Sequence, residues 1–211
     1  MNFNIIIYRK FGKKFIDLLM SSIVLILSLP IWTLVCIHQV KIFKFRMFFT
    51  QSRLTVHERE FKIIKFRTMY ELYSANGQLL PDKDRIGGLG HIMRRFSVDE
   101  LPNLLNVLKG DMSLVGPRPL PVGFEQNMSE AHKKRFKVKS GITGLAQING
   151  RNNLSWSQKI NYDLEYIDNY SFYLDMLVLL KTVRIVLSNK GSVNRDLHNL
   201  GIDAYMPKFD N

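Results

Sequence analysis

A long apolar segment near the N-terminus dominates the pattern of hydrophobic and polar positions. Residues 18–40 run for 23 positions without a formal charge, and a helix rising about 1.5 Å per residue would carry them over roughly 34 Å. This length predicts a membrane helix. Basic residues before the segment would also fit a signal peptide, but CIHQVKIFKF offers no small-x-small cleavage site. We therefore expect the segment to be retained.

Pro30 lies near the middle of this segment. A proline removes one backbone hydrogen bond and crowds the carbonyl four residues earlier, here that of Ile26, and Ser28 is near enough to satisfy a freed group. A break at Ser28 and Pro30 predicts a re-entrant helix that enters the bilayer and returns to the same side. A single straight anchor with a proline kink stays open, because membrane helices tolerate proline.

Shorter patterns follow. Residues 61–69 (FKIIKFRTM) alternate loosely and predict a strand, whereas residues 74–90 are rich in Gly, Asp and Asn and predict a turn-rich connection. Residues 99–109 carry leucines at spacings of 3, 4 and 7, which predicts an amphipathic helix that Gly110 stops. GPRPLP, at 116–121, can be neither helix interior nor central strand and predicts an ordered extended loop.

Two further helical regions are expected, one beginning near Trp156 and one over residues 174–187. The second fits either a core helix or an amphipathic interfacial helix with Lys181 and Arg184 toward lipid headgroups. No internal repeat is visible. The chain therefore divides into three parts: a basic N-terminus with the apolar membrane segment (1–40), one compact domain (41–187) and a polar C-terminal tail (188–211).

Composition and charge narrow the class of protein. The 211 residues are 46% hydrophobic and include one cysteine, Cys36, which excludes wholesale disorder and an internal disulfide framework. Thirty Lys and Arg against eighteen Asp and Glu give +12, a field that suits phospholipid, nucleotide or nucleic acid. Residues 1–53 hold eight of these basic residues and one acid, so they carry +7. Basic residues flank the apolar segment on both sides, which predicts that both ends face the cytoplasm.

Asp99 and Glu100 are the strongest candidates for chemistry. Neighbouring helical residues point about 100° apart, so one acid could attack a substrate while the other holds a metal. A structural alternative stays open, because Ser97 and Glu100 match the S-x-x-E capping box and acids are common in a first helical turn. Pro102 fits that box poorly, since it would lie too deep in a helix capped at Ser97.

Several basic residues are interleaved with Gly and Pro at turns and element ends, where arginine forks commonly hold phosphate oxygens. A divalent cation between a carboxylate and phosphates would reconcile the acids with such an anion site. Zinc is not indicated, because Cys36 lies in the apolar segment and the histidines lack ligand spacing. The basic residues in question are Lys65, Arg67, Arg85, Arg94, Arg118 and Arg151.

Three strings, KFRTM, SVDELPNLLNVLKGDMSLVGPRPL and GITGLAQINGRN, follow the basic apolar N-terminus. Together they resemble the bacterial sugar transferase family of monotopic phosphoglycosyl transferases, over residues 11–187. The resemblance implies a re-entrant helix that docks a small α/β-type domain on the cytoplasmic face of the bacterial inner membrane. It also implies transfer of a sugar-1-phosphate from a UDP-sugar to undecaprenyl phosphate, with release of UMP.

The same resemblance implies roles for single residues. Asp99 would be the nucleophile that forms an aspartyl phospho-sugar, and Glu100 would bind Mg²⁺. Two acids, Asp163 and Asp175, match acidic positions near the C-terminal end of the family, in a substrate or structural role. The residues expected to hold substrate phosphates are Lys65, Arg94, Arg118 and Arg151.

A rival interpretation is a membrane-tethered basic adaptor that binds anionic lipid or nucleic acid without catalysis. It accounts for the charge and the anchor but gives no reason for an acidic pair beside GPRP, and no nucleic-acid motif is visible. We therefore expect UDP-sugar, undecaprenyl phosphate and an anionic phospholipid membrane as partners, and no nucleic acid. A homodimer is compatible with the sequence.

Overall fold

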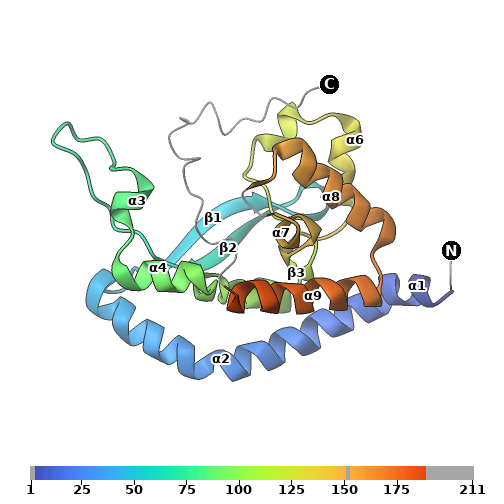
Figure 1. Ribbon diagram of the computed structural model, residues 1–211, viewed down its shortest axis with the longest axis horizontal. Helices are drawn as coiled ribbons and strands as arrows, with labels where there is room; N and C mark the ends of the chain where they lie inside the picture. The colour runs from blue at the N-terminus through green and yellow to red at the C-terminus, as the bar shows by residue number, and fades with distance from the viewer. Residues whose placement is uncertain (1–2, 151–152, 189–211) are drawn as a thin grey trace.

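The computed structural model describes residues 3–150 and 153–188, and Figure 1 shows their arrangement. Short 3-10 or π helices are labelled η. The elements are α1 (Phe3–Ile7), η1 (Tyr8–Gly12), α2 (Lys13–Phe43), β1 (Phe48–Leu54), η2 (Val56–Glu58), β2 (Glu60–Phe66), α3 (Asp82–Arg85), α4 (Gly88–Arg95), η3 (Val98–Glu100), α5 (Asn103–Lys109), β3 (Ser113–Val115), η4 (Phe124–Asn127), α6 (Glu130–Lys133), η5 (Lys134–Lys137), β4 (Gly141–Thr143), α7 (Leu145–Ile148), α8 (Trp156–Asn169) and α9 (Phe172–Leu187).

The chain contains two small sheets in addition to its helices. β1 and β2 form an antiparallel hairpin, and the short strands β3 and β4 pair in parallel. A parallel pair needs a crossover, and here the chain between β3 and β4 contains η4, α6 and η5. This mixture of helices and small sheets is compatible with the predicted small α/β domain.

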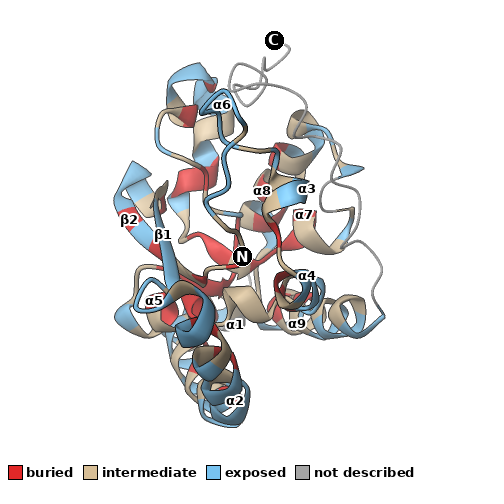
Figure 2. Cartoon of the chain, turned by 90° about the vertical axis from the view of Figure 1, so that its left-hand side faces the viewer, coloured by how far each residue is buried: buried red, intermediate tan, exposed pale blue. Residues whose placement is uncertain are grey.

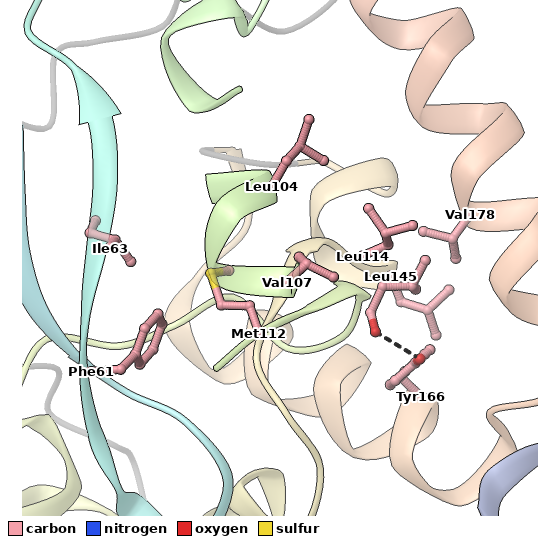
Figure 3. Packing of buried hydrophobic residues seen from close by; sticks show 10 residues of the cluster. Phe61, Ile63, Leu104, Val107, Met112, Leu114, Leu145, Tyr166 and Val178 are labelled. Carbon is pink, nitrogen blue, oxygen red and sulfur yellow. Dashed lines mark hydrogen bonds between the residues drawn. The ribbon is translucent and has the colours of Figure 1, made fainter. Parts of the chain in front are cut away.

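The main core lies between β2 and the helices α5, α8 and α9. Phe61 and Ile63 alternate along β2 and turn inward toward Val107 and Met112 (Figure 3). On the opposite side of this cluster the Tyr166 hydroxyl donates to the carbonyl oxygen of Val115 at 3.0 Å. This bond satisfies a polar atom inside the core, where an unpaired hydroxyl would be costly.

α2 has its polar side turned inward and its apolar side outward. Four of its five buried residues are polar, while large apolar side chains such as Leu27 and Leu34 are 73% and 70% exposed. Figure 2 shows the outer side of α2 as a largely exposed surface. The helical segment Ile5–Phe43 is long and apolar enough to cross a membrane. The buried residues are Asp17, Ser21, Ser28, Val35 and Gln39.

The predicted break at Pro30 is wrong in one respect, since α2 stays helical through Pro30. Figure 1 shows a bent helix whose two ends both turn toward the rest of the molecule. Ser28 also differs from expectation: its hydroxyl donates to the carbonyl of Leu25 at 3.0 Å, not to that of Ile26, which lies opposite the missing proline amide. One lost hydrogen bond therefore bends the helix without ending it.

Most of the other predicted elements are present. The strand expected over 61–69 is β2, which ends at Phe66, and the last two helices begin at Trp156 and Phe172. The prediction of a turn-rich connection over 74–90 is partly wrong, because α3 lies within it and α4 already starts at Gly88. Gly90 serves close packing there, since a Cβ would lie 2.6 Å from the Thr68 carbonyl oxygen. The sequence alone does not distinguish a glycine needed for close packing from one needed for a turn.

α9 has one face in the core and one exposed face. Asp175 and Val178 are buried against the body, whereas Leu180 and Val183 are 72% and 57% exposed. One face of α9 thus belongs to the core, and the other remains available to an interface. The tail prediction lies outside the described residues, apart from Ser188.

Candidate active site

Glu100 is the centre of a small charge cluster. Lys65, near the end of β2, and Arg118, in the GPRP loop, both contact its Oε1, at 2.5 Å and 3.2 Å. Oε2 takes part in neither ion pair. Burial alone would raise the pKa of Glu100, but the charges of Lys65 and Arg118 outweigh it and hold that pKa well below its usual range. Glu100 is therefore ionised at neutral pH.

Asp99 has a different environment, although it is the next residue. Burial first, and then the negative charge of Glu100, raise its pKa from 3.8 to about 6. Lys65 and Arg94 oppose this rise from a distance, but within the described part of the chain neither forms an ion pair with Asp99. An ionised carboxylate that is not neutralised by a close cation is available to react.

The backbone separates the two acids from the following helix. Ser97 adopts a left-handed conformation (φ 55°), η3 carries both acids, and α5 begins only at Asn103, after Pro102. The predicted helix over 99–109 thus starts later than expected, and Gly110 ends it as predicted, at φ 84°. Ser97 makes no capping hydrogen bond. The capping-box interpretation is therefore wrong, and Glu100 is held by cations instead.

Two buried asparagines fix the acids relative to Lys65. Asn103 Oδ1 accepts from the backbone amide of Ile64 at 3.0 Å, and Asn106 Nδ2 donates to the carbonyl of Lys62 at 3.1 Å. Together these bonds tie α5 to β2, the strand that carries Lys65. Sequence reasoning missed them, although two Asn residues on the apolar side of a predicted helix were a visible sign of polar anchoring.

The other predicted phosphate-binding residues are distributed unevenly. Arg94, at the end of α4, donates from Nε to Thr68 Oγ1 at 2.8 Å, and its charge acts on Asp99. Arg151 lies outside the described residues. Beside Glu100 is a solvent-open hollow with an empty volume of about 320 Å³. It is lined by Arg53, Ile63, Lys65, Glu100, Asn103, Met112, Arg118, Pro119, Gly141 and Ile142.

Both C-terminal acids have close partners in the structure. Asp163 pairs with Arg135 at 2.6 Å, and both side chains are buried. Asp175 accepts from the hydroxyls of Tyr8 and Tyr166 and pairs with Lys13 at 2.7 Å. The network around Asp175 connects the N-terminal helices to α8 and α9.

The acidic residues alone cannot enclose a metal ion. Within the described residues no group of three or more His, Cys, Asp or Glu side chains is placed to bind one. Mg²⁺ prefers six oxygen ligands and commonly takes several from substrate phosphates and water. A magnesium ion at Asp99 and Glu100 would therefore need most of its ligands from groups other than these two carboxylates.

Comparison with known proteins adds the class of chemistry. The chain matches the family model described as bacterial sugar transferase over residues 8–189. The chain belongs to the bacterial sugar transferase family. The predicted family and the prediction of a transferase enzyme are thus confirmed, and the non-catalytic adaptor is wrong.

Individual relatives in the family differ in length. The uncharacterized sugar transferase EpsL of Bacillus subtilis (strain 168) is 50% identical over 145 residues, covering 69% of this chain and 72% of EpsL. Exopolysaccharide production protein ExoY of Rhizobium meliloti (strain 1021) is 32% identical over 203 residues, covering 86% and 88%. The UDP-glucose:undecaprenyl-phosphate glucose-1-phosphate transferase of Klebsiella pneumoniae is 34% identical over 196 residues, covering 88% of this chain but 41% of the relative.

Proposed function

We propose that this bacterial sugar transferase moves a sugar-1-phosphate from a UDP-sugar to undecaprenyl phosphate at the cytoplasmic face of the inner membrane. The observation that carries the proposal is the contrast between two adjacent acids. Asp99 has no ion pair within the described residues and a raised pKa, while Glu100 lies between two cations. The name of the Klebsiella pneumoniae relative supplies the two substrates.

In the first step an oxygen of the Asp99 carboxylate attacks the phosphorus next to the sugar. The bond between this phosphorus and the oxygen that bridges the two phosphates breaks, and UMP leaves. An aspartyl phospho-sugar remains on the protein. In the second step a phosphate oxygen of the lipid attacks the same phosphorus, which releases Asp99 and forms a polyprenyl diphosphate sugar.

Lys65 and Arg118 would hold the diphosphate, since both line the hollow and each is within 3.2 Å of Glu100. Arg94 would add positive charge near Asp99. Mg²⁺, bound by Glu100 together with the diphosphate, would offset charge on the reacting phosphoryl oxygens. As the substrate enters, Lys65 and Arg118 would leave the Glu100 carboxylate and contact phosphate oxygens instead.

Membrane attachment is proposed from the inverted polarity of α2. Its exposed apolar side would enter the bilayer, while both of its ends contact the same body. Near the N-terminal end Asp17 accepts from Ser113 Oγ and the Leu114 amide, and near the C-terminal end Gln39 donates to the Arg67 carbonyl at 2.8 Å. These contacts support the re-entrant arrangement over a straight spanning anchor.

The reaction is tested by incubating purified protein with a panel of UDP-sugars and Mg²⁺, without lipid acceptor. The correct UDP-sugar should release up to one equivalent of UMP and raise the intact mass of the protein by one sugar phosphate. Undecaprenyl phosphate should then remove this mass. Lipid-dependent turnover without any protein adduct would exclude the covalent route but not the transferase activity.

The topology is tested separately by cysteine labelling in intact cells. Lys10→Cys and Ala75→Cys, each in a Cys36→Ala background, place single thiols before and after α2. We expect a membrane-impermeant reagent to label neither until the cells are opened. Labelling of Lys10→Cys alone in intact cells would establish a spanning helix.

A further inference from the structure

The GPRP loop is fixed through its carbonyl oxygens. Its prolines have no amide hydrogen to donate, yet four consecutive carbonyls, of residues 117–120, all accept hydrogen bonds. The pairs are Gly141 N to Pro117 O at 2.9 Å, Arg135 Nη2 to Arg118 O at 2.8 Å, Arg53 Nη1 to Pro119 O at 3.4 Å and Leu54 N to Leu120 O at 2.9 Å. The loop is thus irregular in conformation but held at every carbonyl over this stretch.

One of these donors, Arg135, is a buried charged side chain. It is 3% exposed, and its partner Asp163, on α8, is 4% exposed. Nε and Nη2 of Arg135 both donate to Asp163 Oδ2, at 3.0 Å and 2.6 Å. A buried guanidinium needs such a counterion, because an unpaired charge in the interior is very costly. Asp163 therefore fixes the orientation of the guanidinium, and the guanidinium fixes the carbonyl of Arg118.

The bond to this carbonyl affects the charge cluster at Glu100. The Arg118 side chain is 55% exposed, whereas that of Lys65 is 19% exposed and extends from a strand. A long exposed side chain loses rotamer entropy when it is ordered, so the position of its backbone largely determines where its guanidinium can reach. Arg118 thus depends on its loop more than Lys65 depends on its strand.

We propose that Arg135 and Asp163 form a positioning pair for Arg118. Neither lines the hollow beside Glu100, so they act on the diphosphate through Arg118 and are not catalytic residues themselves. This inference rests on the proposed function, in which Arg118 holds the substrate. It gives Asp163 a defined role at the site, exerted from the opposite side of the GPRP loop.

A double-mutant cycle measures this dependence. Arg135→Lys keeps the charge for Asp163, but one ammonium group cannot reproduce the planar fork that reaches two partners. In the wild-type background we expect it to lower kcat/KM for UMP release by about tenfold, mainly through KM. In an Arg118→Ala background the same substitution should change kcat/KM by less than about twofold, because residues that act through one another are not additive.

Asp175→Asn is the matched control, since it also alters a buried acid but one that contacts neither Arg135 nor the GPRP loop. Its effect on kcat/KM should be the same factor in both backgrounds. Should Arg135→Lys fold poorly, Asp163→Asn in the same cycle tests the same pair, because the amide keeps an oxygen that accepts from Arg135. Circular dichroism and thermal unfolding of each variant monitor the fold.

The outcomes are distinct. A reduction by the same factor in both backgrounds would show that Arg135 contributes to general stability, and the positioning role would be wrong. Arg118→Ala alone could leave kcat/KM unchanged while the protein still forms the sugar-phosphate adduct. Arg118 would then not hold the diphosphate, and the positioning role of Arg135 and Asp163 would be wrong. The transferase reaction itself would stand in that case. Absence of both the adduct and lipid-dependent UMP release in the wild-type protein would instead contradict the proposed function.

Discussion

Asp175 and Asp99 both lie in the first turn of a helical segment, but their surroundings are opposite. Asp175 accepts hydrogen bonds from the hydroxyls of Tyr8 and Tyr166 and forms an ion pair with Lys13. Asp99 lies beside another carboxylate, and burial raises its pKa to about 6. A carboxylate whose oxygens are occupied holds helices together, whereas one without a close cation is costly to keep ionised and available for chemistry.

The difference also concerns what each acid does for stability. Breaking a satisfied buried ion pair leaves an uncompensated charge and destabilises a protein. Removing the charge of an acid with a raised pKa does the reverse, because the folded state then no longer has to hold an ionised carboxylate in a poor environment. The two acids should therefore respond to the same Asp→Asn change with opposite signs, and substitution experiments can test this directly.

The largest effect is expected for Asp99→Asn. The amide has no oxygen nucleophile comparable to a carboxylate, so the sugar-phosphate adduct should be absent and UMP release should fall by at least about a thousandfold. At pH 7 the free energy of unfolding should rise by roughly 1 to 3 kcal/mol, the order implied by the shift from 3.8 to about 6. Intact-protein mass and denaturant unfolding provide the two measurements.

The matched control for this variant is Asp175→Asn at the other acid. An adduct that persists in Asp99→Asn, or that maps to another residue, would remove Asp99 as the nucleophile. A loss of stability in Asp99→Asn would show that its carboxylate is satisfied in the folded protein, and the contrast with Asp175 would then be incorrect.

Asp175→Asn should cost about 3 kcal/mol of unfolding free energy, because the largely enclosed Lys13 loses its ion-pair partner. Asp175 belongs to the network that connects the N-terminal helices to α8 and α9, and not to the charge cluster at Glu100. The adduct should therefore still form at 20 °C in the folded fraction. Denaturant unfolding in detergent measures the loss. A folded Asp175→Asn protein without any adduct would mean that this acid acts in the reaction.

One of these acids stands out in the sequence more clearly than the other. The pairing of Asp99 with Glu100 is local, and the motif around it is long, so both residues were identified before the fold was known. The partners of Asp175 come from positions 8, 13 and 166, and no local pattern joins them. Periodicity finds helices, but it does not reveal which distant side chains meet.

The same limit applies to the bend in α2 and to the GPRP loop. Hydropathy located the apolar segment, yet the inward direction of Asp17 and Gln39 follows from contacts with Ser113 and Arg67, far along the chain. GPRP was correctly predicted as an extended loop from its prolines. The hydrogen bond from Arg135 to this loop was not predicted, because a basic residue in a lysine-rich segment is usually exposed and solvated.

Glu100→Gln sharpens the contrast within the acidic pair. We expect UMP release to fall by about a hundredfold and the Mg²⁺ concentration for half-maximal activity to rise, because the amide is a weaker ligand for a hard cation. Lys65 and Arg118 lose their carboxylate partner, so UDP should bind more tightly than to the wild-type protein when Mg²⁺ is absent. Calorimetric titration with UDP, with and without Mg²⁺, measures both effects. If the affinity for UDP without Mg²⁺ were unchanged, removal of the Glu100 carboxylate would not have made Lys65 and Arg118 available to phosphate.

The smallest effect, and the most specific, is the pH dependence caused by Asp99. Since its pKa is raised in the folded protein to about 6, the folded state binds more protons than the unfolded state between its usual value of 3.8 and about 6. Its contribution to stability is therefore favourable at low pH and is lost as pH rises through this window. The rate of adduct formation should change in the opposite direction, falling about tenfold per pH unit below 6 as the nucleophile becomes protonated.

The physical cause of this shift can be divided by experiment. Burial is the larger cause and the charge of Glu100 the next, so Glu100→Gln should lower the midpoint of adduct formation below 6 without returning it to the usual value of an exposed aspartate. Stability measured from pH 4 to 7 should lose the corresponding slope in Asp99→Asn and keep it in Asp175→Asn. A midpoint that does not move in Glu100→Gln would assign the whole shift to burial, and the neighbouring carboxylate would then have no electrostatic influence on the nucleophile.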